Sequence, residues 1–319
     1  MRIANPIYDT VFKYLLEDIE IAKGIIGRII GEEITELYFR PEELKTKSEK
    51  YLVIILRIDF KAVIKTKNGT YKKILIEIQK GKDDEDIVRF RKYLSENYQG
   101  KDNIKTDKGE EEKVLPIVPI YFLGFPLQKI DAAALKVGRN YIDLIGDKKI
   151  TVKNHFIERL THDGYFIQIG KLRKVDTKAK NSLERVLRVF NQSYRLTNDR
   201  RLLEISEKEL DTDPLLKKVI ERLHRAAADT EILKKIDVEE QVEERIEKQL
   251  RKVAELQEKM DIKDKVLEEK DKVLERLNNE KISAAKSLIV STTLSDEQIS
   301  SIQKMDIKTV QNIRQELKK

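Results

Sequence analysis

Three side chains in the first quarter of the chain carry oxygen atoms of the kind that bind a hard divalent cation. Asp59 lies in one strand-like segment, and Glu77 and Gln79 lie in the next. Mg²⁺ takes oxygen ligands in an octahedral arrangement and keeps several waters, so two carboxylates and a backbone carbonyl suffice to hold it. Asp59 and Glu77 would supply the carboxylates, and Ile78 the carbonyl. A cation held in this way polarises a phosphodiester and lowers the pKa of the attacking water.

The two segments that carry these residues have the pattern of neighbouring β-strands. Residues 52–65 and 73–80 alternate between apolar and polar side chains, so each would bury one face and keep the acids on the other. Residues 67–70 have the sequence Lys-Asn-Gly-Thr, a strong signal for a hairpin turn. The alternative is that both acids are ordinary solvated residues of a strand face.

The length of the turn decides whether the two acids share a face. A two-residue loop at Asn68–Gly69 would pair residues whose numbers sum to 137, which places Asp59 opposite Ile78 and away from Glu77. We therefore predict a three-residue loop, with Gly69 in the left-handed conformation of a G1 bulge. In that register Asp59 lies nearly opposite Glu77.

A long amphipathic helix is predicted before the strands, from residue 8 to residue 30, because apolar residues recur there at helical spacing. Its polar side carries Asp9, Lys13 and Glu17 at successive i, i+4 positions, which is either a solvated face or part of the site. Three glycines are expected to allow close packing or to end the helix: Gly24, Gly27 and Gly31.

The remaining elements of the first half complete an order of helix, strand, strand, strand, helix, strand. The first strand is expected at residues 34–40 and the last at residues 114–122, where two prolines favour an edge or a strand start. The second helix follows Gln79 and has an apolar stripe. Another hairpin-like pair is expected at residues 155–159 and 164–170.

Beyond residue 180 the sequence is helical in pattern, and it predicts a coiled coil. Apolar residues recur every seven positions, with three partial companions and three polar interruptions: Ile246, Val253, Met260, Leu267 and Leu274; Val242, Leu256 and Leu277; Gln249, Lys263 and Lys270. The simplest assembly is a homodimer, and the alternative is a single charged helix. Short helices follow, one of them beginning with a capping box at Ser295. The last two helices form either a packing or dimerisation hairpin or a DNA-binding helix-turn-helix.

Three segments within about the first 125 residues carry most of these features: IANPIYDTVFKYLLED, RIDFKAVIKTKNGTYKKILIEIQK and RFRKYLSENYQG. In order and spacing they resemble the recombination-promoting nuclease and transposase family of the PD-(D/E)XK nuclease superfamily. The resemblance implies a restriction-endonuclease-like αβββαβ core, with a mixed sheet flanked by helices. It also implies hydrolysis of DNA with Mg²⁺ or Mn²⁺.

The same resemblance implies roles for the oxygen ligands. Asp59 matches the strand Asp of the family, and Glu77 and Gln79 match its Glu-x-Gln pair, so Asp59 and Glu77 would bind metal. Asp9 matches the first residue of an Asp-x-x-Phe-Lys pattern and would complete the site from the helix. Gln79 stands where the superfamily has Lys. It would orient the water, but it offers neutral dipoles where Lys donates a charge-assisted hydrogen bond.

Basic and aromatic residues would contact DNA in this scheme. Lys13 completes the Asp-x-x-Phe-Lys pattern, and Arg89 and Tyr93 match the basic-aromatic helix of the family. Arg91 takes the place of Arg89 if the register slips by two residues. Lys13 and Arg89 could reach into the site to replace the missing Lys, or could be ordinary surface cations or ion-pair partners.

Composition excludes several other classes of chemistry. The chain has no Cys, so it lacks disulfides and thiolate sites and suits a reducing compartment; with no long apolar run or signal peptide we expect a cytoplasmic protein. Its three His residues have no metal-ligand spacing, and no phosphate-binding glycine loop or nucleophile elbow is present. Lys plus Arg number 64 against 57 for Asp plus Glu, a surplus compatible with a polyanionic partner or with solvation alone.

The sequence therefore predicts an α/β core followed by an all-α tail. We expect a PD-(D/E)XK domain over residues 1–175, a helical region over 176–235, a coiled coil over 236–280 and a helical hairpin over 281–319. The predicted function is that of a metal-dependent DNA endonuclease. The alternatives are a weak or inactive relative that binds DNA or a protein partner, and a purely structural coiled-coil protein.

Overall fold

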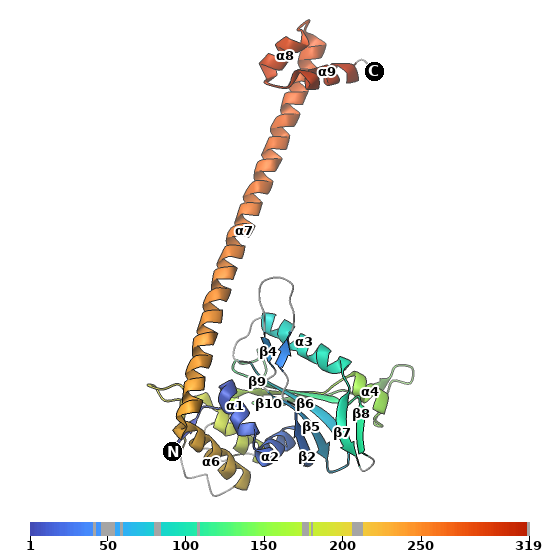
Figure 1. Ribbon diagram of the computed structural model, residues 1–319. Coiled ribbons are helices and arrows are strands. Elements are labelled where there is room, and N and C mark those ends of the chain that lie inside the picture. The colour runs from blue at the N-terminus through green and yellow to red at the C-terminus, as the bar shows by residue number, and fades with distance from the viewer. Residues whose placement is uncertain are drawn as a thin grey trace. The chain divides into compact units, whose positions relative to one another are not determined.

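The computed structural model describes residues 1–40, 43–45, 55–57, 60–79, 84–106, 109–173, 179, 181–205 and 213–317. It has two compact units, Met1–Gln241 and Val242–Lys319 (Figure 1). The first unit is built around a mixed sheet with helices on both faces, which confirms the α/β class. The helix α7 (Thr230–Ser291) begins in the first unit and forms most of the second. None of the described helices is long and apolar enough to cross a lipid bilayer.

The main sheet has six strands in the order β10-β13-β9-β6-β5-β2. Their bounds are Ile34–Phe39 for β2, Phe60–Thr66 for β5, Tyr71–Gln79 for β6, Ile117–Leu123 for β9, Ala134–Val137 for β10 and Gly164–Gln168 for β13. β2, β5 and β6 pair antiparallel, whereas β9 is parallel to β6 because the helix α3 (Asp84–Gln99) lies on the connection between them. β13 is parallel to β9 and β10 antiparallel to β13.

The strand predicted over residues 52–65 is described as two pieces. β4 (Ile55–Arg57) pairs antiparallel with β3 (Glu43–Lys45) in a separate two-stranded sheet, and β5 begins at Phe60. The other strand pairs are β1 (Arg2–Ala4) with β14 (Leu202–Glu204), β7 (Asp102–Thr106) with β8 (Gly109–Lys113), and β11 (Tyr141–Asp143) with β12 (Lys148–Ile150).

The single helix predicted for residues 8–30 is in fact two helices. α1 (Asp9–Leu16) ends before Asp18, whose side chain accepts hydrogen bonds from the amides of Glu20 and Ile21 and so begins α2 (Ile19–Ile30). An Asp at this position favours a new N-cap over helix continuation. Gly31 ends α2 with φ 73°, as the sequence indicates.

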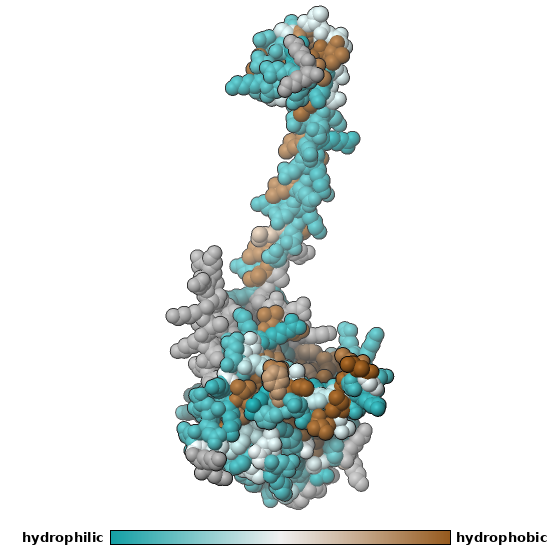
Figure 2. Space-filling view, turned by 90° about the vertical axis from the view of Figure 1, so that its right-hand side faces the viewer, coloured by the Kyte–Doolittle hydropathy of each residue, from teal (hydrophilic) through white to brown (hydrophobic). Residues whose placement is uncertain are grey.

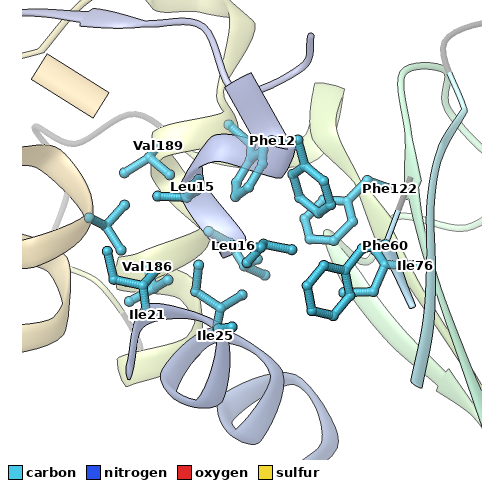
Figure 3. Close-up of a cluster of buried hydrophobic side chains, with 14 of the residues drawn as sticks. Phe12, Leu15, Leu16, Ile21, Ile25, Phe60, Ile76, Phe122, Val186 and Val189 are labelled. Atoms are coloured by element: carbon cyan, nitrogen blue, oxygen red, sulfur yellow. The ribbon is translucent and has the colours of Figure 1, made fainter. Parts of the chain in front are cut away.

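The main core lies between the sheet and these two helices. Figure 3 shows Phe12, Leu15 and Leu16 from α1 with Ile21 and Ile25 from α2, gathered beside Phe60, Ile76 and Phe122 of the sheet. Val186, Val189 and Phe190 enter the same cluster, and the ring of Phe12 lies 6.1 Å from that of Phe190.

Residues 181–241 therefore belong to the first unit, although the sequence-based division places a boundary at residue 175. The described part of this segment contributes α5 (Ser182–Leu187), two short 3₁₀ turns (Arg188–Phe190 and Gln192–Tyr194) and α6 (Pro214–Ala228). Close packing explains two of the three glycines. A Cβ on Gly24 would lie 2.6 Å from the Leu215 side chain of α6, and a Cβ on Gly27 would lie 2.8 Å from the Glu32 carbonyl oxygen.

The hairpin predicted at residues 155–170 is wrong. Residues His155–Leu160 form the helix α4, because the Asn154 side chain accepts hydrogen bonds from the amides of Phe156 and Ile157 and acts as its N-cap. The second segment is indeed a strand, β13, but its partners are β9 and β10.

The second unit ends in a small helical cluster. The end of α7 packs with α8 (Asp296–Gln303) and α9 (Ile307–Glu316) through Ala285, Ile299, Val310 and Ile313. The predicted capping box at Ser295 is confirmed, with Gln298 as its reciprocal partner.

A bidentate ion pair joins α2 to α6. The Arg28 guanidinium donates to both carboxylate oxygens of Asp213, at 2.7 and 2.9 Å, and Asp213 is also the N-cap of α6. Burial by itself raises the pKa of Asp213, but the hydrogen bonds from Arg28 and the α6 amides outweigh burial and hold that pKa below its ordinary value. The pair therefore stabilises the fold at neutral pH, and its contribution is lost as pH falls through that lowered pKa.

Arg28→Ala is expected to lower the free energy of unfolding by about 3 kcal/mol at pH 7, because it leaves the Asp213 carboxylate buried without its main partner. The difference from wild type should shrink as the pH is lowered below 4. Urea unfolding at several pH values measures both effects. Lys23→Ala, on the same helix and paired to the exposed Glu20, is the control and should change stability by less than about 0.5 kcal/mol. A pH-independent loss would contradict the assigned role of Asp213.

Candidate active site

The hairpin register gives the parity that the candidate site requires. Phe60 pairs with Ile76 and Lys65 with Tyr71, so paired residue numbers sum to 136. The Thr66 amide donates to the Thr70 carbonyl, which leaves three residues in the loop, and Gly69 has φ 77°. The predicted three-residue loop with a left-handed Gly69 is confirmed.

The two faces of β6 differ in chemistry. Ile74, Ile76 and Ile78 point into the main core beneath α1 and α2. The intervening residues occupy the other face, where Leu75 packs with Phe90 and Tyr93 of α3. Lys73, Glu77 and Gln79 share that face by strand alternation: all three are polar and buried.

Glu77 lies deep in this face and Gln79 nearer its end, at 2% and 9% exposure. Glu77 pairs across to Tyr121 of β9, whose ring is stacked on Phe166 at 4.7 Å and contacts Phe90 at 4.2 Å. Burial, and then the negative charge of Glu77, raise the pKa of the Tyr121 phenol far above its ordinary value. Tyr121 therefore remains neutral, and with Phe90 and Phe166 it gives the Glu77 carboxylate an environment of low polarity.

A buried ion pair closes the opposite end of the polar face. The Lys73 ammonium lies 2.8 Å from the Asp102 carboxylate, with both side chains at most 6% exposed, and it donates to the Asn97 carbonyl at 3.0 Å. Lys73 therefore joins β6 to the end of α3 and to β7. This contact fixes the helix that covers Glu77.

The second predicted carboxylate, Asp59, lies outside the described residues, next to the first residue of β5. Glu77 and Gln79 supply one carboxylate and one amide oxygen on one face, a donor chemistry that suits a hard cation. Within the described ranges no three acidic or His side chains come together as metal ligands. A complete site would therefore need a donor such as Asp59.

Asp9 and Lys13 form an ion pair with each other. The Lys13 ammonium lies 2.7 Å from the Asp9 carboxylate, as one of the two alternatives for Lys13 anticipated. The Asp9 amide donates to Glu239 of α7 at 2.8 Å. Asp9 opens a helix that covers the face opposite Glu77, and its contacts among the described residues do not come from β6. Its Oδ1 atom is buried and accepts no hydrogen bond within the described part of the chain.

The predicted DNA contacts on α3 differ in exposure. Arg91 is exposed, as is its neighbour Lys92, which was not among the predicted contacts. Tyr93 is 1% exposed and packs edge to face against Phe90, so it is a core residue rather than a surface contact. The side chain of Arg89 lies outside what the structure describes.

Two residues of this face were not singled out from the sequence. Lys61 pairs with Leu75 and so lies on the Glu77 side, diagonal to Glu77 at a spacing of about 7–8 Å, which a lysine side chain spans. The sequence could have identified Lys61, because a residue two positions after Asp59 lies on the same strand face. Tyr121 could not be found in the same way, because its place beside Glu77 follows from the parallel pairing of β9 with β6.

Comparison of the chain with known proteins gives no family-model match, no match among curated proteins and no match among solved structures. The functional argument therefore depends on the geometry of this face and on the sequence pattern.

Lys73→Met is expected to cost about 3–5 kcal/mol of unfolding free energy, because it leaves the Asp102 charge buried. The double variant Lys73→Met/Asp102→Leu should recover most of that loss, since an apolar pair replaces an ion pair without an orphaned charge. Urea unfolding of the wild type, both single variants and the double variant gives the coupling free energy. Additive losses would show that the two side chains do not act as a pair.

Proposed function

We propose that the first unit is a Mg²⁺- or Mn²⁺-dependent DNA endonuclease of the recombination-promoting nuclease type, with a PD-(D/E)XK core. The observation that carries the proposal is the register of β5 with β6. It has the parity that would bring a strand Asp opposite Glu77, and a two-residue loop would have destroyed that parity. The order of helix, three antiparallel strands, helix and parallel strand adds support.

In this proposal Asp59 would continue β5 by one residue and face Glu77, and the two carboxylates would hold the cation. When bound, the cation would acidify the attacking water and polarise the scissile phosphate. Gln79, two residues beyond Glu77 on the same face, orients the water through its amide. Asp9 is left out of the ligand set, because α1 packs on the opposite face of the sheet, against Ile74, Ile76 and Ile78.

The superfamily lysine needs a substitute, because Gln79 carries no charge. Lys61 is the candidate that the strand register favours, since it shares the face of Glu77 and belongs to the strand that follows Asp59. An ammonium there would donate a charge-assisted hydrogen bond to the phosphate. Arg91 and Lys92, exposed on α3, would contact the DNA backbone and position it without reading its sequence.

One observation favours a second candidate function. The neutral Gln79 weakens the case for hydrolysis, and a fold of this kind without turnover would act as a module that binds DNA or a protein partner. In that case DNA affinity would remain, and it would fall steeply as salt is raised.

Supercoiled plasmid with Mg²⁺ or Mn²⁺ is the test of hydrolysis. Asp59→Ala and Glu77→Ala should each reduce the cleavage rate by more than about 100-fold. Loss of a residue that only hydrogen-bonds to a metal ligand already lowers activity by about 10–100-fold. Glu112→Ala, an exposed acid on β8, is the matched control and should cleave at the wild-type rate. Cleavage that persists in Asp59→Ala and Glu77→Ala would remove the site assignment, and salt-sensitive binding without cleavage in the wild type would establish the binding module.

Gln79→Lys restores the side chain of the superfamily and should raise the cleavage rate. Lys61→Met should lower the cleavage rate in the wild type. The same substitution should lower the rate by a smaller factor in the Gln79→Lys background. Equal effects of Lys61→Met in both backgrounds would contradict the substitute role of Lys61.

A further inference from the structure

The middle of α7 carries an apolar seam that the described part of the chain leaves open. Seven aliphatic or Met side chains at heptad positions are 47–63% exposed: Val242, Val253, Leu256, Met260, Leu267, Leu274 and Leu277. Figure 2 shows apolar patches standing along this helix between hydrophilic ones. A repeat of seven residues keeps such side chains on one side of a supercoiled helix, as two-stranded coiled coils require.

Both ends of the same helix are covered by the chain itself. Ile232 and Ile236 are buried in the core of the first unit, and Ala285 is buried against α8 and α9 in the second. The sequence can thus cover an apolar face of α7 where a partner element exists within the chain. Between residues 242 and 277 no described part of the chain covers this face.

We propose that this seam pairs with the seam of a second copy in antiparallel orientation, centred between residues 261 and 262. A second copy presents the same heptad repeat over the same length, so every apolar layer finds an apolar or long-stemmed partner. The proposal concerns the second unit and does not depend on the nuclease assignment.

Two lysines within the seam distinguish the orientations. In a parallel pair each d position faces its own copy, so Lys263 would meet Lys263 of the second copy and Lys270 would meet Lys270. Like charges held face to face repel, and partial removal of water from the seam strengthens the repulsion. Two such layers in close succession would interrupt the middle of a parallel dimer.

In the antiparallel pair, facing a and d residues have numbers that sum to 523. Lys263 then faces Met260, Lys270 faces Val253, and Leu256 faces Leu267. Each lysine lays its aliphatic stem along an apolar neighbour and keeps its ammonium in water. The antiparallel arrangement therefore removes both facing lysine pairs and keeps the apolar layers intact.

The flanking charges do not reverse this preference. A parallel pair would place Lys259 near Asp264 of the second copy, and the antiparallel pair places Arg245 near Glu280. Each arrangement has one such attractive contact per chain, and exposed ion pairs contribute little to the free energy of association. The lysines inside the seam decide the orientation.

The full chain contains no Cys, so single cysteines introduced into the seam report its geometry directly. Leu256→Cys and Leu267→Cys are made as separate full-length variants and oxidised alone and as an equimolar, co-refolded mixture. The antiparallel pairing predicts a disulfide only between the two different variants. Within one variant the two sulfurs are separated by 11 residues of helix, about 16 Å, which a disulfide does not bridge.

Sedimentation of the wild type should give twice the chain mass of 37.3 kDa, and far-UV circular dichroism should show that both variants keep their helix content. Efficient disulfides within Leu256→Cys alone would establish a parallel pair and overturn the proposal. A monomeric mass at micromolar concentration would also overturn it.

A second variant tests the role of the seam lysines. Lys263→Leu/Lys270→Leu removes the repulsion from the parallel pair, so Leu256→Cys in this background should gain self-disulfides at least several-fold over Leu256→Cys alone. An exposed pair outside the seam, Lys272→Leu with Glu268→Leu, is the matched control and should leave the pattern unchanged. No gain in the lysine variant would show that other residues set the orientation.

Discussion

The register between β5 and β6 is the constraint on which the candidate site depends. Strand side chains alternate between faces, so one residue more or less in the turn would move every polar residue of β6 relative to its partner strand. The three-residue loop with Gly69 at φ 77° sets the paired numbers to a sum of 136. Lys61 lies on the face of Glu77 and Gln79 for that reason, while the isoleucines between Lys73 and Gln79 fill the core beneath α1.

Burial of charged side chains on the α3 face needs compensation within the fold. Lys73 and Asp102 neutralise each other, and the Asn97 carbonyl accepts a further hydrogen bond from the lysine. The aromatic residues Phe90, Tyr121 and Phe166 then exclude water around Glu77. Burying a carboxylate is unfavourable compared with leaving it in water. A buried acid at this position is therefore a candidate functional residue rather than a solvated strand residue.

Local patterns in the sequence were informative where a single element decides the outcome. The turn at Gly69, the capping box at Ser295 and the C-cap at Gly31 follow from residues close together in the chain, and all three are present. The same kind of information failed at Asp18 and Asn154. At Asp18 the N-cap interrupts a longer helical periodicity, and at Asn154 the N-cap begins a short helix where a hairpin strand was predicted.

By itself the sequence determined the heptad seam of α7, the alternation of the hairpin strands and the set of oxygen-bearing residues, because each is a matter of spacing along one element. Only the tertiary structure decided that Tyr93 is buried, that Tyr121 stands beside Glu77 and that residues 181–241 join the first unit. Those facts arise from contacts between segments far apart in the chain, where packing against a shared core outweighs local preference. The spacing of residues along one segment does not predict which distant segment will pack against it.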